Sequence, residues 1–269
     1  MRAFVCGLAG PVLSDNERQF LRDQQPWGVI LFARNLESTD QIKALTADIL
    51  AALDRERAPI LIDQEGGRVQ RIGPPVCRRH PAARVYGDLY RREPILGVEA
   101  ARLGAKLIGI ELADLGITVN CMPVLDVVTE GTAEAIGDRS YGYDADTVLT
   151  LGGAVADGLA AAGIVPVMKH LPGHGRAQVD SHKKLPVIET DLETLEATDF
   201  KPFRLWARRI PAGMTAHVVL TAVDDKSPAT LSDKVIGGII RGRIGFDGLL
   251  MTDDISMGAL NGPVGARAE

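Results

Sequence analysis

The stretch Ile164-Val-Pro-Val-Met-Lys-His-Leu-Pro-Gly-His-Gly-Arg-Ala-Gln-Val-Asp-Ser-His182 joins a short apolar run to a polar loop. The apolar run, residues 164–168, does not alternate strictly between apolar and polar positions, which is typical of a parallel strand covered on both faces. The loop holds three of the five histidines in the chain, and Gly173 and Gly175 permit tight turns in it. The stretch therefore predicts a buried parallel strand with functional groups at its carboxyl end.

The same kind of apolar run recurs along the whole chain. The other six runs cover residues 3–8, 28–32, 60–62, 117–124, 213–219 and 248–251. Longer segments with helical periodicity separate the runs. Capping-box patterns, which mark helix starts, occur at Ser14-Asp-Asn-Glu17, Ser38-Thr-Asp-Gln41 and Thr190-Asp-Leu-Glu193. The runs repeat at intervals of about 41 residues, which suits one strand, one helix and two loops. We therefore predict an α/β fold of the TIM type, a (β/α)8 barrel.

A Rossmann-type sheet is the competing architecture, but the chain has neither of the glycine-rich phosphate-binding motifs of such sheets. No linker-like segment interrupts the repeats, so residues 1–269 are predicted to form a single catalytic barrel domain. The chain stops at Glu269, just after the seventh expected strand and the start of a helix over residues 257–268. A closed barrel needs one more strand and helix. We therefore expect a barrel truncated before its eighth strand and helix.

Composition and charge exclude several classes of protein. The net charge of −5, from 30 Lys+Arg and 35 Asp+Glu, gives no electrostatic reason to bind nucleic acid or an anionic membrane. No uncharged run approaches the roughly 18 residues of a membrane span. Cys6, Cys77 and Cys121 form no cysteine cluster, which suits a reducing compartment. Because the apolar N-terminus is better explained as a first strand than as a signal sequence, we expect a cytoplasmic protein.

Polar residues follow five of the apolar runs at the point where each run ends. In a β/α barrel, catalytic residues from separate strands converge at this edge. Any one of these residues alone is better explained as a strand-end side chain that bonds a loop amide. Five strands in succession favour a functional site, formed from Asp63, Glu65, Asp126, Lys169, His170, His217, Asp253 and Asp254.

The Asp180-Ser-His182 segment suggests a general acid/base. An Asp that accepts a hydrogen bond from one ring nitrogen orients the imidazole and leaves the other nitrogen free to move a proton. A solvated polar loop is the alternative, because Asp-x-His alone is a weak signal. His170, His174, Asp180 and His182 could in principle bind a metal, but no zinc-binding spacing occurs in the chain. We therefore expect neither a metal nor another cofactor.

Seven motifs follow one another along the chain. They are Gly28-Val-Ile-Leu-Phe-Ala-Arg-Asn35, Leu61-Ile-Asp-Gln-Glu-Gly-Gly-Arg-Val-Gln-Arg71, Met122-Pro-Val-Leu-Asp-Val127, Gly137-Asp-Arg-Ser-Tyr-Gly142, the loop over residues 169–182, Met214-Thr-Ala-His217 and Thr252-Asp-Asp-Ile-Ser-Met257. Together these motifs resemble glycoside hydrolase family 3, and most closely its bacterial β-N-acetylhexosaminidase branch, which works in peptidoglycan recycling. The match spans about positions 26 to 260, in the family's order.

The resemblance implies a role for each matching residue. Asp253 corresponds to the family's nucleophile, and Asp180 is expected to orient His182 as the acid/base. Asp254 is kept as an alternative nucleophile, since strand alternation would point the two neighbouring carboxylates to opposite sides. The positions expected to bind the sugar are Asp63, Arg71, Arg139, Lys169, His170 and His217.

The resemblance thus implies a retaining exo-β-N-acetylglucosaminidase that hydrolyses terminal GlcNAc from β-1,4-linked anhydro-muropeptides through a covalent glycosyl-enzyme. Phosphorolysis is an alternative, because a histidine acid/base is never negative and would not repel phosphate. A family member of other β-glycoside specificity and a non-catalytic sugar-binding barrel are further alternatives. The expected partner is a small carbohydrate, with no nucleic acid or membrane, and we expect a monomer.

Overall fold

The computed structural model describes residues 1–181 and 184–260, and its centre is a curled parallel sheet. Seven strands form the sheet in the order β1-β2-β3-β6-β7-β9-β11. Their bounds are β1 Arg2–Gly7, β2 Pro26–Leu31, β3 Ile60–Ile62, β6 Val119–Asn120, β7 Val165–Leu171, β9 Ala212–Thr215 and β11 Leu249–Thr252. All neighbouring strands pair in parallel. The seven predicted strands and their order are therefore confirmed.

The predicted strand ends are less accurate than the strand positions. Residues 117–124 were expected to form one strand, but β6 covers only Val119–Asn120. The run over residues 213–219 contains β9 and then the separate strand β10, Val219–Leu220, which pairs with β8, Val187–Ile188. A small antiparallel hairpin, β4 Gln64–Gly66 with β5 Val69–Gln70, follows β3. The expected truncation of the barrel before an eighth strand and helix stays a prediction.

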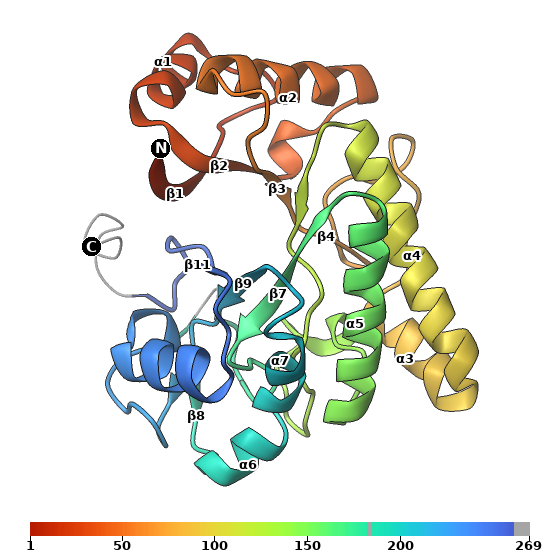
Figure 1. Ribbon diagram of the computed structural model, residues 1–269, viewed down its shortest axis with the longest axis vertical. Helices are drawn as coiled ribbons and strands as arrows, with labels where there is room; N and C mark the ends of the chain where they lie inside the picture. Colours follow the sequence, from red (N-terminus) through yellow and green to blue (C-terminus); the bar gives the residue numbers. More distant parts are fainter. Residues whose placement is uncertain (182–183, 261–269) are drawn as a thin grey trace.

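Helices cover the outer side of the curled sheet, and Figure 1 shows α4 and α5 side by side along it. The α-helices are α1 Asp15–Gln24, α2 Thr39–Leu53, α3 Ala83–Arg92, α4 Pro94–Asp114, α5 Ala145–Ala161, α6 Leu192–Ala197 and α7 Phe200–Trp206. Short 3-10 helices cover η1 Ala33–Asn35, η2 Gly137–Arg139 and η3 Ala229–Leu231, and η4 Lys234–Arg243 is a π-helix. The alternation of strands and helices follows the predicted pattern.

The three expected helix starts differ in outcome. Ser14 and Glu17 form the complete capping box before α1. Ser38 caps α2 by accepting from the backbone N–H of Gln41. The start expected at Thr190 is wrong by one residue, because Asp191 is the N-cap of α6 and its carboxylate accepts from the Thr194 N–H at 2.8 Å.

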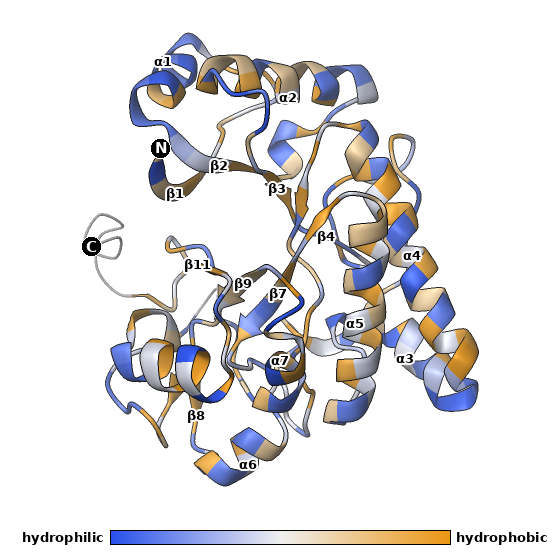
Figure 2. Ribbon diagram, in the orientation of Figure 1, coloured by the Kyte–Doolittle hydropathy of each residue, from blue (hydrophilic) through white to orange (hydrophobic). Residues whose placement is uncertain are grey.

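The hydrophobic core has two parts, one on each side of the sheet. The larger part lies between the sheet and the helices, and it includes Leu31, Ile62, Leu112 and Leu159. The smaller part is on the concave side and contains Leu61, Val119, Cys121, Val167, Ala212 and Met214. In Figure 2 the helices carry both hydrophilic and hydrophobic colours, as expected for helices with one face on the core.

The segment after β11 does not begin with the expected helix. Residues 257–260 form turns, and residues 261–268 lie outside the described part of the chain. Cys77 and Cys121 are buried free thiols, and Cys6 is half-buried. None of the helices within residues 1–181 and 184–260 is both long and apolar enough to cross a lipid bilayer.

Candidate active site

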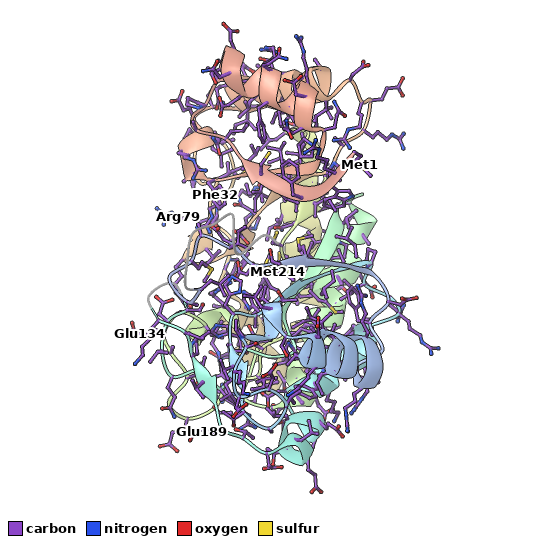
Figure 3. The ribbon with its side chains drawn as sticks, turned by 90° about the vertical axis from the view of Figure 1, so that its left-hand side faces the viewer. Met1, Phe32, Arg79, Glu134, Glu189 and Met214 are labelled. Carbon is purple, nitrogen blue, oxygen red and sulfur yellow. The ribbon has the colours of Figure 1, made fainter. Side chains whose placement is uncertain are left out.

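A polar pocket of about 310 Å³ opens at the carboxyl edge of the sheet. Residues from five separate segments of the chain meet there, as the strand-end pattern predicts. Met214, one of its lining residues, lies near the middle of the molecule in Figure 3, whereas Glu134 and Glu189 lie at the margin. The lining residues are Asp63, Arg68, Val69, Arg71, Ala135, Ile136, Arg139, Lys169, His170, His174, Asp180, Ser181, Met214 and Asp253.

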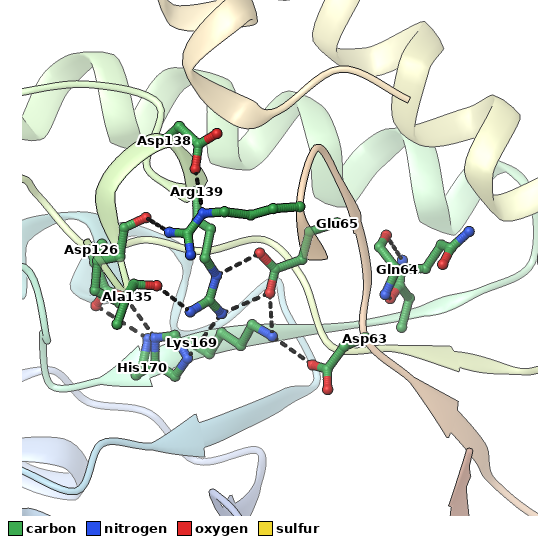
Figure 4. A network of polar contacts seen from close by, with 12 residues as sticks. Asp63, Gln64, Glu65, Asp126, Ala135, Asp138, Arg139, Lys169 and His170 are labelled. Carbon is green, nitrogen blue, oxygen red and sulfur yellow. Dashed lines mark hydrogen bonds and ion pairs between the residues drawn. The ribbon is translucent and has the colours of Figure 1, made fainter. Parts of the chain in front are cut away.

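One wall of the pocket is a network of ion pairs centred on Lys169 (Figure 4). The ammonium group of Lys169 lies 2.7 Å from Asp63 and 2.7 Å from Glu65. Arg139 donates to both oxygens of Glu65 at 2.8 Å, and Arg71 lies 3.4 Å from Asp63. The Lys169 side chain is only 2% exposed, so its charge is compensated inside the protein. The network presents fixed donors and acceptors suited to a polyhydroxylated ligand.

The network keeps its members charged. Burial favours the neutral carboxylic acid of Glu65, but Arg139 and Lys169 outweigh burial and lower the pKa of Glu65 far below its usual range. The pKa of Asp63 is lowered too, because Lys169 outweighs its burial. Burial likewise opposes the charge of Lys169, but Asp63 and Glu65 raise the pKa of Lys169 well above its usual value. These groups therefore bind and orient, and they are unsuited to moving protons at neutral pH.

Beside this network, Asp126 holds two histidines of the 169–182 loop. Its carboxylate is fully buried and lies 2.6 Å from Nδ1 of His170. It also accepts from the backbone N–H groups of His170 at 3.3 Å and His174 at 2.7 Å. Burial favours the neutral acid, but His170 outweighs burial and the pKa of Asp126 is lowered. Because an ionised carboxylate only accepts, the proton is on Nδ1 of His170 and Nε2 faces Arg139, at 3.5 Å.

The two carboxylates after β11 have different surroundings. Asp253 lines the pocket, and its Oδ1 accepts from the Asp254 N–H at 2.8 Å. Oδ1 of Asp254 accepts from the backbone N–H of Ser256 at 2.8 Å and from its hydroxyl at 2.6 Å. Asp254 is thus engaged in its own turn, just beyond the end of β11. The geometry favours Asp253 as the group that meets a ligand.

His217 supports this segment from behind. Its ring is buried, and Nε2 donates to the backbone carbonyl of Asp254 at 3.0 Å. Nδ1 lies 2.7 Å from the hydroxyl of Thr230. Both ring nitrogens are therefore engaged by the protein. The structure gives His217 a positioning contact to the Asp253–Asp254 segment, and its predicted contact with the sugar is untested.

The expected acid/base pair is only partly described. Asp180 and Ser181 line the pocket, whereas His182 lies outside the described residues. Its role, like the pairing with Asp180, stays a prediction. Within residues 1–181 and 184–260, no three His, Cys, Asp or Glu side chains are grouped so that they could hold a metal ion.

Glu65, Asp126 and Arg68 were given no binding or catalytic role from the sequence, although Glu65 and Asp126 hold pocket residues in place and Arg68 lines the pocket. Glu65 and Asp126 were recognised as strand-end carboxylates, but their partners, Arg139 and His170, are 74 and 44 positions away in the chain. Arg68 also lines the pocket and donates to Asp138 at 2.7 Å. The signal that could have marked Glu65 and Arg68 was present, because both belong to the motif over residues 61–71 that contains Asp63 and Arg71.

A parallel α/β sheet whose carboxyl edge combines fixed carboxylates, cations and imidazoles is typical of barrel-type enzymes. Residues 7–268 match the glycosyl hydrolase family 3 N terminal domain, and the chain belongs to that family. The family predicted from the motifs is thus confirmed, and so is the enzyme class, a glycoside hydrolase.

Relatives in this family cover nearly all of the chain. It is 39% identical to a beta-hexosaminidase from Aromatoleum aromaticum over 254 residues, which are 93% of this chain and 70% of that protein. It is 40% identical to a beta-hexosaminidase from Alkalilimnicola ehrlichii, and the match covers 98% of this chain and 76% of that protein. The structure is similar to that of NagZ from Neisseria gonorrhoeae in complex with N-trifluoroacetyl-D-glucosamine, with a TM-score of 0.91 and 37% sequence identity. The match covers 98% of this chain and 76% of the Neisseria chain.

Proposed function

We propose that this protein is a retaining exo-β-N-acetylglucosaminidase. Its substrate class is β-1,4-linked anhydro-muropeptides from cell-wall recycling, from which it removes the terminal GlcNAc. The relatives named beta-hexosaminidase and the glucosamine derivative bound by the Neisseria protein support the part of this proposal that concerns the terminal GlcNAc.

The observation that carries the proposal is that Asp253 lines the same pocket as Asp63, Arg139 and Lys169 of the ion-pair network. Charged and bidentate groups there can hold the hydroxyls of one sugar ring. A ring held in this way would present its anomeric carbon to the Asp253 carboxylate. This combination of a charged binding wall and the Asp253 carboxylate in one pocket suits covalent glycoside cleavage.

In the proposed mechanism, an oxygen of Asp253 forms a bond to the anomeric carbon while the glycosidic C–O bond breaks. The leaving oxygen takes a proton from His182, which Asp180 orients. His182 then removes a proton from water, the water oxygen bonds to the anomeric carbon, and Asp253 is released. Two displacements at one carbon retain its configuration. Imidazole suits both steps, since its ordinary pKa of about 6.5 is close to neutral pH.

The proposal includes a place of action and an assembly state. Free thiols at Cys77 and Cys121 are consistent with a reducing compartment, so we propose that the enzyme works in the cytoplasm. We also propose that it acts as a monomer without a metal or other cofactor.

The test uses two chromogenic substrates, 4-nitrophenyl β-N-acetylglucosaminide and β-glucoside, and proton NMR of the first-formed sugar. We expect cleavage of the acetamido substrate with the β-anomer released first. Asp253→Asn should lower kcat by at least about 10³-fold, because an amide cannot form the glycosyl ester. Asp254→Asn is the matched control and should retain most of the activity. Release of the α-anomer, or inactivity of Asp254→Asn with an active Asp253→Asn, would contradict the mechanism.

A further inference from the structure

Asp199 is a buried carboxylate that the proposed mechanism does not use. It lies between α6 and α7 (Figure 1), and its side chain is only 2% exposed. An Asp directly before a helix usually accepts a hydrogen bond from a backbone N–H of the first turn, as Asp144 and Asp191 do before α5 and α6. Asp199 makes no such bond to the first turn of α7, all of which the structure describes. Its carboxylate therefore has a role other than capping.

The carboxylate bonds the loop over residues 169–182 instead. Oδ2 of Asp199 accepts from Nε of Arg176 at 2.7 Å, and the hydroxyl of Thr198 lies 2.7 Å from the same oxygen. Nη2 of Arg176 donates to that hydroxyl at 3.0 Å. The loop backbone also comes close to this point, because a Cβ added at Gly173 would lie 3.0 Å from Cβ of Asp199. The junction between α6 and α7 thus holds the loop through the Arg176 side chain.

Arg176 lies between a fixed part of the loop and the part that leads to the proposed acid/base pair. Before it, the backbone N–H of His174 donates to the buried carboxylate of Asp126 at 2.7 Å. After it, residues 177–179 carry no charge, and residues 178 and 179 are exposed. The chain then returns to the pocket, which Asp180 lines. Arg176 is therefore the last charged side chain that fixes the loop before Asp180.

Stability does not explain this ion pair. Oδ1 of Asp199 is buried and has no hydrogen-bond partner within residues 1–181 and 184–260. Burial raises the pKa of Asp199, although Arg176 and Thr198 act in the opposite direction. Because the folded chain holds this proton more tightly than the unfolded chain does, the group contributes less stability at pH 7 than at low pH. What the pair supplies is a fixed direction for the Arg176 side chain, and with it the course of the loop.

We propose that Asp199 is a positioning residue for the acid/base step. Through Arg176 it holds the loop so that Asp180, and the acid/base group that Asp180 orients, reach the leaving oxygen of a sugar bound at Asp253. Within the described part of the chain, the residues that line the pocket include neither Arg176 nor Asp199, so the pair acts through the loop and not on the substrate. This inference rests on the proposed function, because it takes the acid/base role of the loop from that mechanism.

The test compares kcat/KM for 2,4-dinitrophenyl and phenyl β-N-acetylglucosaminides in wild type, Arg176→Met and Arg176→Lys. Dinitrophenolate leaves without a proton, whereas phenolate needs the general acid. We expect Arg176→Met to lower kcat/KM about thirtyfold on the phenyl glycoside and less than about threefold on the dinitrophenyl glycoside. Lysine keeps a cation that can pair with Asp199, and we expect Arg176→Lys to recover most of the loss.

Arg18→Met is the matched control, because Arg18 pairs with Asp48 at 3.3 Å and does not line the pocket. It should leave kcat/KM unchanged on both glycosides. If Arg176→Met does not fold, because it leaves Asp199 buried without its cation, the double variant of Arg176→Met with Asp199→Asn takes its place. That variant holds no unpaired buried charge, and we expect the same selective loss. Equal losses on the two glycosides would overturn the proposal, since a merely structural role affects both alike, and so would unchanged kinetics.

Amide hydrogen exchange of the free enzyme separates this proposal from the proposed function. We expect peptides within residues 173–181 to exchange at least about tenfold faster in Arg176→Met than in wild type, with the rest of the chain unchanged. If wild type cleaves neither glycoside, the proposed function fails, and faster exchange confined to this segment would still support the anchoring of the loop by Asp199. Exchange that is unchanged in the segment, or that rises equally throughout the chain, would overturn that anchoring.

Discussion

Replacement of Lys169 by Met tests whether the ion-pair wall of the pocket depends on one buried cation. Met has a similar length and no charge, so the change removes the partner of Asp63 and Glu65 with little change in volume. Arg139 still pairs with Glu65, and Arg71 still lies 3.4 Å from Asp63. Asp63 therefore loses its closest cation.

The distances set the size of the effect. At an effective dielectric constant of about 20, two unit charges 2.7 Å apart attract each other by about 6 kcal/mol. Desolvation of the buried ammonium group offsets much of this attraction. Removal of one partner from a buried pair typically costs about 3–5 kcal/mol, and we expect Lys169→Met to lower the free energy of unfolding by that amount at pH 7.

The pH dependence gives the result a second, independent check. The pKa values of Asp63 and Glu65 are lowered, so the stability that these groups contribute is present above their ordinary values of 3.8 and 4.5 and is lost as pH falls through the lowered ones. In Lys169→Met both pKa values rise, and protonation relieves the unpaired charge. The difference between variant and wild type should therefore shrink between pH 7 and pH 3.5.

Urea unfolding followed by circular dichroism at the two pH values measures this difference. Lys43→Met is the matched control, because Lys43 pairs with Asp114 at 2.9 Å on the surface, and we expect a cost below about 1 kcal/mol. A cost for Lys169→Met no larger than that of Lys43→Met would refute the reasoning. So would a cost that is the same at pH 7 and pH 3.5.

Three further predictions concern the rest of the pocket. Asp126→Asn should lower kcat/KM at least about tenfold in steady-state assays, because His170 loses a charge-assisted hydrogen bond. Unchanged kinetics would show that His170 needs no orienting group. The free energy of unfolding should fall as pH is lowered from 6.5 toward 4, and His174 should contribute at most about 3 kcal/mol of this fall, because burial lowers the pKa of its imidazole to about 4 and the ring takes up a proton in the unfolded chain before it does so in the folded one. Urea unfolding of His174→Gln should show a weaker fall, and a fall identical to that of wild type would contradict the buried neutral ring. Hydrolysis should be indifferent to dialysis against EDTA, and a loss that zinc restores would revive a metal mechanism.

Much of the fold and of the pocket was predictable from the sequence. The apolar runs locate all seven parallel strands, because a strand buried on both faces needs continuous apolar residues. Parallel strands also bring their carboxyl ends to one edge, so residues as distant as Asp63 and Asp253 were expected to meet, and both line the pocket.

Other features depend on packing that no local pattern contains. Thr190 and Asp191 are both good helix caps, and only the folded backbone selects Asp191. The pairing of Glu65 with Arg139 depends on how η2 docks over the β4–β5 hairpin. The burial of His174 follows from the close approach of Gly175 to Val127, which brings together residues from two separate loops.

The central claim is that Asp253 becomes covalently bonded to the anomeric carbon. The most direct measurement is the intact mass of the protein after incubation with a fluorinated GlcNAc-type reagent that traps the glycosyl-enzyme, followed by peptide mapping. Fluorine slows the second displacement, so an intermediate should accumulate. We expect one adduct per chain, located on Asp253 and missing from Asp253→Asn. The absence of an adduct in an enzyme that turns over GlcNAc substrates, or an adduct on Asp254, would contradict the account.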